Sequence, residues 1–204
     1  MKITGYSTNK LGTNSYLIEN EGKAIIIDPC VKYDYIVGKT SSKIVAVVIT
    51  HAHFDHIDQL KTYLNKDLDF YMHENAYHKL QDSKGNLSHM TGFPFEFDLE
   101  NEKVMFIKDY DHFNLIGKEI SFMYLPGHSN CSIALVIDEH MFLGDVVFRG
   151  SVGRYDLPTS NYSDLIDSIN RLKNLKKNYY IYSGHGPKTD LEFEKKNNPF
   201  FRWD

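Results

Sequence analysis

The stretch THAHFDHIDQL, from Thr50 to Leu60, holds three histidines and two aspartates within eleven residues. It directly follows KIVAVVI, an apolar run with β-branched residues that predicts a strand covered on both faces. Imidazole nitrogens and carboxylate oxygens suit Zn, Mn or Fe, so the pattern indicates metal ligands where a buried strand ends. The candidate ligands are His51, His53, Asp55 and His56. Four donors so close together cannot all reach one tetrahedral ion without strain, which favours two neighbouring ions.

Three later motifs supply the further donors that two ions need. In LPGHS, FLGDV and YSGHGP, a glycine comes after a predicted strand and directly precedes a donor; these donors are His128, Asp145 and His185. Glycine adopts backbone angles barred to other residues, so we expect each glycine to turn the chain sharply and aim the next side chain across a strand edge. The pattern predicts that four strands deliver ligands to one rim, where sheet proteins commonly keep their ligand sites.

The remaining chain shows short apolar runs separated by turn residues. NEG, at 20–22, separates SYLIE from KAIIIDP and predicts a hairpin. HIDQLKTYL, from His56 to Leu64, has the spacing of an amphipathic helix that Asp55 could cap. Further strands are expected in LDFYM, KVMFI, ISFMYL, SIALVI, HMFLG and NYYIYSG, and a helix in YSDLIDSINRLKNL. Apart from KVMFI, the segment from His73 to Lys118 yields no assignment and has the character of loops that border a site.

Composition narrows the class of protein. The 204 residues, 42% hydrophobic and 25% charged, indicate one soluble domain over 1–204. The net charge is −4 and the basic residues are scattered, which argues against nucleic acid as a partner and leaves a small-molecule substrate. The start MKITGYSTNK lacks the apolar region of a secretory signal, and no apolar run reaches the ~18 residues of a membrane span. We therefore predict a cytoplasmic protein, away from membranes, with Cys30 and Cys131 as thiols; its oligomeric state stays open.

The motifs THAHFDH, GHS, GD and GHGP occur in an order that resembles the metallo-β-lactamase superfamily along almost the whole chain. With NSYLI, IIIDP, GSVGRYDLP and NPF, the chain looks most similar to short bacterial and archaeal hydrolases related to glyoxalase II. The resemblance implies an α/β fold, a four-layer αββα sandwich, with metals at one edge between the sheets. It implies one ion on His51, His53 and His128, another on Asp55, His56 and His185, and Asp145 as the bridge.

The chain departs from the family pattern at three places. Cys30 follows IIIDP where a glycine is familiar, and Asp58 and Gln59 follow DHI where glycines are usual. GHSNCS replaces a more common version with Pro and Gly. None of these changes removes a proposed ligand, so they bear on the shape of the loops and on the fit of the substrate.

The predicted site indicates a hydrolytic mechanism. Two ions, most simply Zn with Fe or Mn as alternatives, about 3.5 to 4 Å apart, would share a water and hold it as a bridging hydroxide nucleophile. A thiolate leaving group departs without much acid help, which favours a thioester, such as an acyl-glutathione, over an amide. Asp55 or Asp145 could take up a proton during turnover. Resemblance to glyoxalase II implies that Arg154, which follows Asp145 by nine residues, binds the anionic tail of a glutathione moiety; an ordinary surface arginine is the alternative.

Two other activities stay open on the same fold. A persulfide dioxygenase would use mononuclear iron on His51, His128 and Asp145, and a lactonase is the other alternative. Full-length glyoxalase II has a C-terminal helical domain, whereas KTDLEFEKKNNPFFRWD provides one helix and a tail, so a glutathione pocket would be incomplete or differently built. The remaining histidines are expected to be bystanders: His73, His78, His89, His112 and His140.

Overall fold

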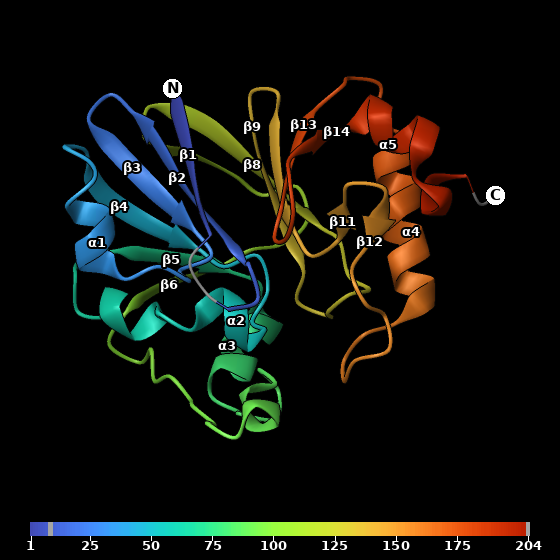
Figure 1. The fold of residues 1–204 in the computed structure, drawn as a ribbon. Coiled ribbons are helices and arrows are strands. Elements are labelled where there is room, and N and C mark those ends of the chain that lie inside the picture. The colour runs from blue at the N-terminus through green and yellow to red at the C-terminus, as the bar shows by residue number, and fades with distance from the viewer. Residues whose placement is uncertain (8–9, 203–204) are drawn as a thin grey trace.

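Two six-stranded sheets form the centre of the protein (Figure 1). The computed structural model describes residues 1–7 and 10–202, so residues 8, 9, 203 and 204 of the predicted 1–204 domain lie outside the described residues. The first sheet contains, in spatial order, β1 (Lys2–Ser7), β2 (Asn14–Asn20), β3 (Lys23–Ile27), β4 (Lys43–Val48), β5 (Asp69–Met72) and β6 (Lys103–Phe106). The second contains β14 (Thr189–Asp190), β13 (Tyr180–Ser183), β10 (His140–Gly144), β9 (Ile133–Ile137), β8 (Lys118–Tyr124) and β7 (His112–Leu115). A short hairpin pairs β11 (Val147–Phe148) with β12 (Ser151–Val152).

Apolar side chains on both faces of each sheet determine the layers. In β3, Ile25 and Ile27 pack against Phe122 and Phe142 of the second sheet, in a core between the sheets. Ile26, on the opposite face of β3, belongs to a separate core beneath the helices. Because successive strand residues point to opposite faces, a strand buried on both sides needs an unbroken apolar run. This explains the sequence KAIII and the run KIVAVV of β4.

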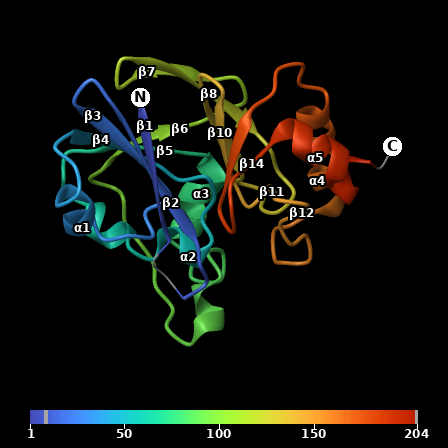
Figure 2. The same cartoon turned by 45° about the horizontal axis from the view of Figure 1, so that its top comes forward.

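Helices cover the two outer faces and complete the sandwich. The outer face of the first sheet packs on α1 (Tyr33–Val37), α2 (Phe54–Ile57), the 3-10 helix η1 (Leu60–Tyr63) and α3 (Glu74–Leu80); the 3-10 helix η2 (Ser88–Thr91) follows α3. The outer face of the second sheet packs on α4 (Tyr162–Lys173), α5 (Leu191–Asn197) and the 3-10 helix η3 (Pro199–Phe201). Figure 2 shows the two helical layers on opposite sides of the sheets. The predicted four-layer αββα sandwich is confirmed.

Strand direction brings the candidate ligands to one edge. Strands β3, β4, β5 and β6 are parallel, so Asp28 after β3 and His51 after β4 follow neighbouring strand ends. In the second sheet, β10 and β13 are parallel, which places Asp145 and His185 after neighbouring ends as well.

Backbone hydrogen bonds join the sheets at that edge. The Ile133 N–H donates to the Thr50 carbonyl at 2.9 Å, and the Asn14 N–H donates to the Gly184 carbonyl at 2.7 Å. Both bonds link chain segments next to candidate ligands. The two sets of strand ends are therefore held against each other by the backbone itself.

Most predicted strands are confirmed, whereas the helix predicted over His56–Leu64 is wrong in its extent. That segment is split into α2, which begins earlier at Phe54, and η1. Gln59 lies between them, and its N–H donates to the Pro29 carbonyl, so the chain turns there. Asp55 lies inside α2, whose N-cap position is His53, so the predicted cap is wrong; the Asp55 carboxylate accepts a hydrogen bond from Thr13 at 2.6 Å.

Elements that lack a strong sequence signal were missed. They include β1, β7 and α3, the last two within the segment from His73 to Lys118 that was interpreted as loops. Among the residues that the structure describes, no helix has both the length and the apolar character that a membrane crossing needs.

Candidate metal centre

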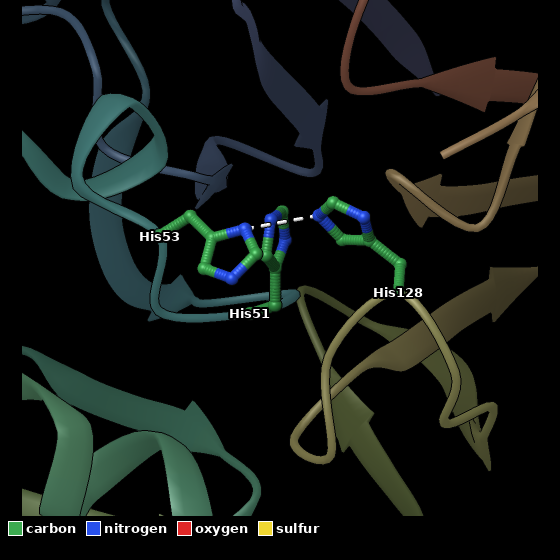
Figure 3. A group of neighbouring side chains, drawn as sticks. All are labelled: His51, His53 and His128. Atoms are coloured by element: carbon green, nitrogen blue, oxygen red, sulfur yellow. Dashed lines mark hydrogen bonds between the residues drawn. The ribbon is translucent and has the colours of Figure 1, made fainter. Parts of the chain in front are cut away.

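Three imidazole rings converge at the edge between the sheets. His51 follows β4, His53 precedes α2, and His128 lies in the loop between β8 and β9; Figure 3 shows their rings facing one another. One nitrogen of each ring lies within 4.8 Å of the others. His53 Nδ1 and His128 Nε2 are 2.9 Å apart. This is the ligand group that the resemblance to the superfamily implies for the first ion.

A second group lies beside the first. Asp55, His56 and His185 also present ligand atoms within 4.8 Å of one another. His185 Nε2 lies 3.2 Å from Asp55 Oδ2, and His56 Nε2 lies 3.6 Å from the same oxygen. These three residues are the predicted ligands of the second ion.

The Asp145 carboxylate lies between the two groups. Its Oδ1 is 3.3 Å from His56 Nε2, and its Oδ2 is 3.5 Å from His185 Nε2, both in the second group. The same Oδ2 is 3.6 Å from His128 Nε2 of the first group. Asp145 alone among the seven candidates has oxygens this close to nitrogens of both groups, in keeping with a bridging ligand.

The chemistry of these side chains fits metal ions. Buried polar atoms normally have a hydrogen-bond partner, because desolvation without one is costly. Within the described part of the chain, several buried atoms of the candidate ligands have none: His51 Nε2, His53 Nε2, His56 Nε2 and Asp145 Oδ1. His51 and His56 are fully buried. Nitrogen and carboxylate donors, packed together and left without partners, are the donor set that Zn, Fe or Mn takes.

The Asp28 carboxylate orients ligands in both groups. It accepts hydrogen bonds from the Thr50 N–H at 2.7 Å, the Thr50 hydroxyl at 2.7 Å and His56 Nδ1 at 2.8 Å. Because a carboxylate only accepts, Nδ1 of His56 carries the proton and Nε2 is left available to a metal. The Thr50 hydroxyl, whose own proton goes to Asp28, lies 3.2 Å from His51 Nδ1 and can accept from it. Sequence reasoning missed Asp28 and Thr50, although both directly follow predicted strands.

The backbone carbonyl of Arg154 plays the corresponding part for His128. His128 Nδ1 donates to it at 2.8 Å, which leaves Nε2 facing the site. The Arg154 guanidinium, by contrast, is on the surface, where its Nε and Nη2 donate to the two oxygens of Asp156 at 2.8 and 3.0 Å. Arg154 thus borders the site through its backbone, and its side chain has an internal partner.

Buried charges at the centre balance one another. Burial lowers the pKa of His51 and His53 well below the usual range, so both rings are neutral, as metal ligands must be. Burial also opposes ionisation of Asp145, but His56 and His185 outweigh it and hold the pKa of Asp145 well below its usual range. Burial would lower the pKa of His185, but hydrogen bonds to Asp145 and Asp55 outweigh it and raise that pKa to about 9. A metal ion bound to His185 would displace the proton from the nitrogen that faces the site.

The three glycines that directly precede His128, Asp145 and His185 are required for two different reasons. Gly127 and Gly144 have φ of 135° and 52°, values that other residues rarely adopt, as predicted. Gly184 is not among the glycines with positive φ, so the prediction is wrong for its backbone angles. A Cβ on Gly184 would instead overlap the Asp145 carboxylate and the His56 ring. Glycine is needed there because two candidate ligands approach the backbone.

The remaining histidines and the cysteines lie outside the ligand groups. The bystander histidines belong to none of the groups found among the described residues; His73, for example, accepts from the Asn75 N–H at the start of α3. Cys30 and Cys131 are buried thiols, as expected.

A buried lysine, which sequence reasoning also missed, supports the loop of His128. Lys79 Nζ donates to the hydroxyls of Ser129, at 2.5 Å, and Thr159, at 2.6 Å. Ser129 directly follows His128, so Lys79 ties the ligand's loop to the loop before α4.

Replacing Asp28 with Asn should weaken metal binding without unfolding the protein. Asn tolerates the left-handed angle of Asp28, φ 52°, but its amide nitrogen cannot accept from Thr50 or His56. We expect metal affinity to fall by about 10- to 100-fold, as for other residues that orient ligands. Asp67→Asn is the matched control, because Asp67 has the same φ and lies on the surface beside Lys103. Calorimetric metal titration measures both variants, and equal affinities in the two would contradict the role of Asp28.

Proteins similar to this chain in sequence or in structure include metal-dependent hydrolases. A curated relative from Streptococcus pyogenes, named as a "Probable metallo-hydrolase", is 36% identical over 98% of this chain and 90% of its own length. The hydroxyacylglutathione hydrolase GloC of Haemophilus influenzae is 29% identical over 91% of each chain. Among solved structures, a B3 metallo-beta-lactamase matches with a TM-score of 0.90 and 27% identity over 99% of this chain and 100% of its own. A protein solved in a di-iron-bound form matches with a TM-score of 0.82 and 30% identity over 97% and 99%. The model of the Metallo-beta-lactamase superfamily matches residues 8–185, and the chain belongs to that superfamily.

Proposed function

We propose that this protein is a metal-dependent hydrolase that cleaves thioesters with two metal ions bound at the candidate centre. The position of Asp145 carries the proposal, because its oxygens lie 3.3 to 3.6 Å from nitrogens of both ligand groups. Relatives named as a metallo-hydrolase and as a hydroxyacylglutathione hydrolase support hydrolysis and, more distantly, a thioester substrate. A small-molecule substrate and a cytoplasmic location remain part of the proposal.

Each residue of the centre has a part in the proposed reaction. When bound, two divalent ions would supply Lewis acidity and a strong nucleophile at neutral pH. His51, His53 and His128 would hold one ion, and Asp55, His56 and His185 the other, with Asp145 shared. Asp28 and the Arg154 carbonyl keep the protons of His56 and His128 on Nδ1, so that the other nitrogens stay directed at the centre. Asp55, which accepts from Thr13, and Asp145 are the carboxylates available to take up a proton.

Zn is the metal that we propose, with Fe and Mn as alternatives. The donor set of imidazoles and carboxylates accepts all three. The similar protein solved in a di-iron-bound form supports iron as the first alternative.

Three rival activities share the fold and need direct comparison. A persulfide dioxygenase would use one iron and leave Asp55, His56 and His185 idle, although their ligand atoms gather beside Asp145. A lactonase would use the same two ions. The B3 metallo-beta-lactamase with a similar structure makes β-lactams a third class of substrate to assay.

Two metal ions per chain are expected after reconstitution with Zn, Mn or Fe. The two groups of donors offer separate sites joined through Asp145. Elemental analysis should find two ions per chain in the wild type and in the bystander variant His78→Ala. It should find fewer than two in His185→Ala. A saturated stoichiometry of one in the wild type would rule out the dinuclear proposal.

Asp145→Ala should lose at least one metal ion and nearly all thioester hydrolysis while the fold stays intact. Its carboxylate is the proposed ligand shared by both ions, and a metal site loses affinity when such a ligand is removed. Asp167→Ala, on the exposed face of α4, is the control with the same change in charge. Circular dichroism, metal content and rates on thioester, lactone, persulfide and β-lactam substrates are the measurements. Full activity of Asp145→Ala would remove the bridge.

Arg154→Ala tests whether the arginine binds an anionic tail. If its guanidinium pairs with a substrate carboxylate, kcat/KM for acyl-glutathione thioesters should fall by roughly tenfold or more, and a neutral thioester should be almost unaffected. Asp156→Ala is the matched variant, because it releases the guanidinium from its internal partner and should not slow the charged substrate. Equal losses on charged and neutral substrates at unchanged metal content would exclude this assignment.

A further inference from the structure

The chain enters β2 directly beside the second ligand group. Thr13, the residue before β2, forms an isolated antiparallel β-bridge with His185, a candidate ligand of the second ion. The Thr13 side chain is buried, and its hydroxyl donates to Asp55 Oδ2 at 2.6 Å. One residue therefore contacts two of the three candidate ligands of the second ion, one through its backbone and the other through its side chain.

The oxygen that Thr13 binds is the one that faces the histidines of the second group. Asp55 Oδ2 lies 3.2 Å from His185 Nε2 and 3.6 Å from His56 Nε2. The terminal torsion of an aspartate is broad, so a carboxylate without a fixed partner turns its oxygens through a range of positions. A short hydrogen bond from a hydroxyl to a carboxylate is among the stronger hydrogen bonds in proteins. The Thr13 hydroxyl thus holds this oxygen on the side of the two imidazoles.

Asn14 fixes the backbone that carries His185. The Asn14 N–H donates to the Gly184 carbonyl at 2.7 Å. Its Nδ2 donates to the carbonyls of Ser183, at 3.0 Å, and Gly186, at 2.9 Å. These carbonyls lie before and after His185 in the chain, so the ligand is held from both sides by the start of β2.

The first ligand group depends on other residues. The Thr50 hydroxyl lies 3.2 Å from His51 Nδ1, and the Arg154 carbonyl accepts from His128 Nδ1 at 2.8 Å. A threonine hydroxyl has a single proton to donate, and that of Thr13 goes to Asp55. Removing the Thr13 hydroxyl therefore takes a donor from the second group and none from the first.

We propose that Thr13 is a positioning residue that sets the affinity of the second metal ion separately from that of the first. Its hydroxyl holds Asp55 Oδ2 toward His56 and His185, so that the three donors already face one another before the ion binds. This inference rests on the two-ion centre of the proposed function and adds the residue that makes the affinities of the two sites independent.

The loop that carries Thr13 also forms a wall of a pocket beside the centre. The pocket has a volume of about 560 Å³, and its described lining includes Lys10, Leu11 and Asp55 but not Thr13. Substitutions at Lys10 or Leu11 would change the pocket together with the loop. Thr13 is therefore the position at which the support of Asp55 can be tested apart from the pocket.

Thr13→Val removes the hydroxyl and keeps the branched shape of the side chain. Calorimetric titration of the metal-free proteins with Zn should show two ions in the wild type. In Thr13→Val the affinity of the second ion should fall by about 10- to 100-fold, with that of the first unchanged. Thr13→Ser restores a hydroxyl and should recover most of the affinity. Thr13→Ala repeats the test with a smaller side chain, and circular dichroism checks the fold of each variant.

Thr189→Val is the matched control, because the buried Thr189 hydroxyl also donates to a buried carboxylate, that of Glu194, at 2.6 Å. It removes the same kind of bond elsewhere in the fold and should leave both metal affinities unchanged. Asp55→Ala assigns the affected site, because it removes the acceptor of the Thr13 hydroxyl. Adding Thr13→Val to Asp55→Ala should have no further effect on metal binding.

Metal affinity judges the role of Thr13 without any substrate, so the inference is tested even if no thioester is cleaved. Two ions with the same two affinities in the wild type and in Thr13→Val would overturn the role of Thr13 and leave the proposed function standing. Equal weakening of both ions, or a loss that Thr13→Ser does not recover, would also overturn it. A wild type that binds a single ion contradicts the two-ion centre itself.

Discussion

The hydrogen bonds accepted by the buried Asp28 carboxylate are the constraint on which the rest of the centre depends. This one side chain, 2% exposed, binds the Thr50 backbone, the Thr50 hydroxyl and His56 Nδ1. Through Thr50 it also reaches His51, so it fixes ligands that belong to both proposed ions. A buried carboxylate is costly unless it is fully paired, which makes the arrangement of its three donors hard to change. The positions of the metal-facing nitrogens follow from it.

The fold brings this constraint within reach of the other ligands. Parallel strand ends in each sheet place donors at the same edge, and backbone bonds such as that from Ile133 to Thr50 hold the two edges together. Gly184 completes the arrangement, because only a residue without a Cβ leaves room for Asp145 and His56. The helices outside the sheets bury apolar surface and contribute α2, which supplies two of the ligands. Stability and site geometry thus depend on the same layers.

The molecule has two neighbouring parts at this edge of the sheets. The metal centre holds the candidate ligands, and a pocket of about 560 Å³ beside it is lined in part by Cys30, Asp58 and Gln59, which belong to neither proposed ligand group. Asp55 belongs to both parts, since its carboxylate is a candidate ligand and also lines the pocket.

The sequence by itself determined most of the strands and the seven candidate ligands, because unbroken apolar runs and closely spaced donors are local patterns. The layered fold was expected only through the resemblance of the ordered motifs to the superfamily. It did not determine the break between α2 and η1, which depends on the bond from Gln59 to the Pro29 carbonyl. Only the tertiary structure decided the partners of Asp28, the internal ion pair of Arg154 and the pocket. Each of these joins residues that are separated in the chain or depends on where a side chain points, so no local pattern encodes it.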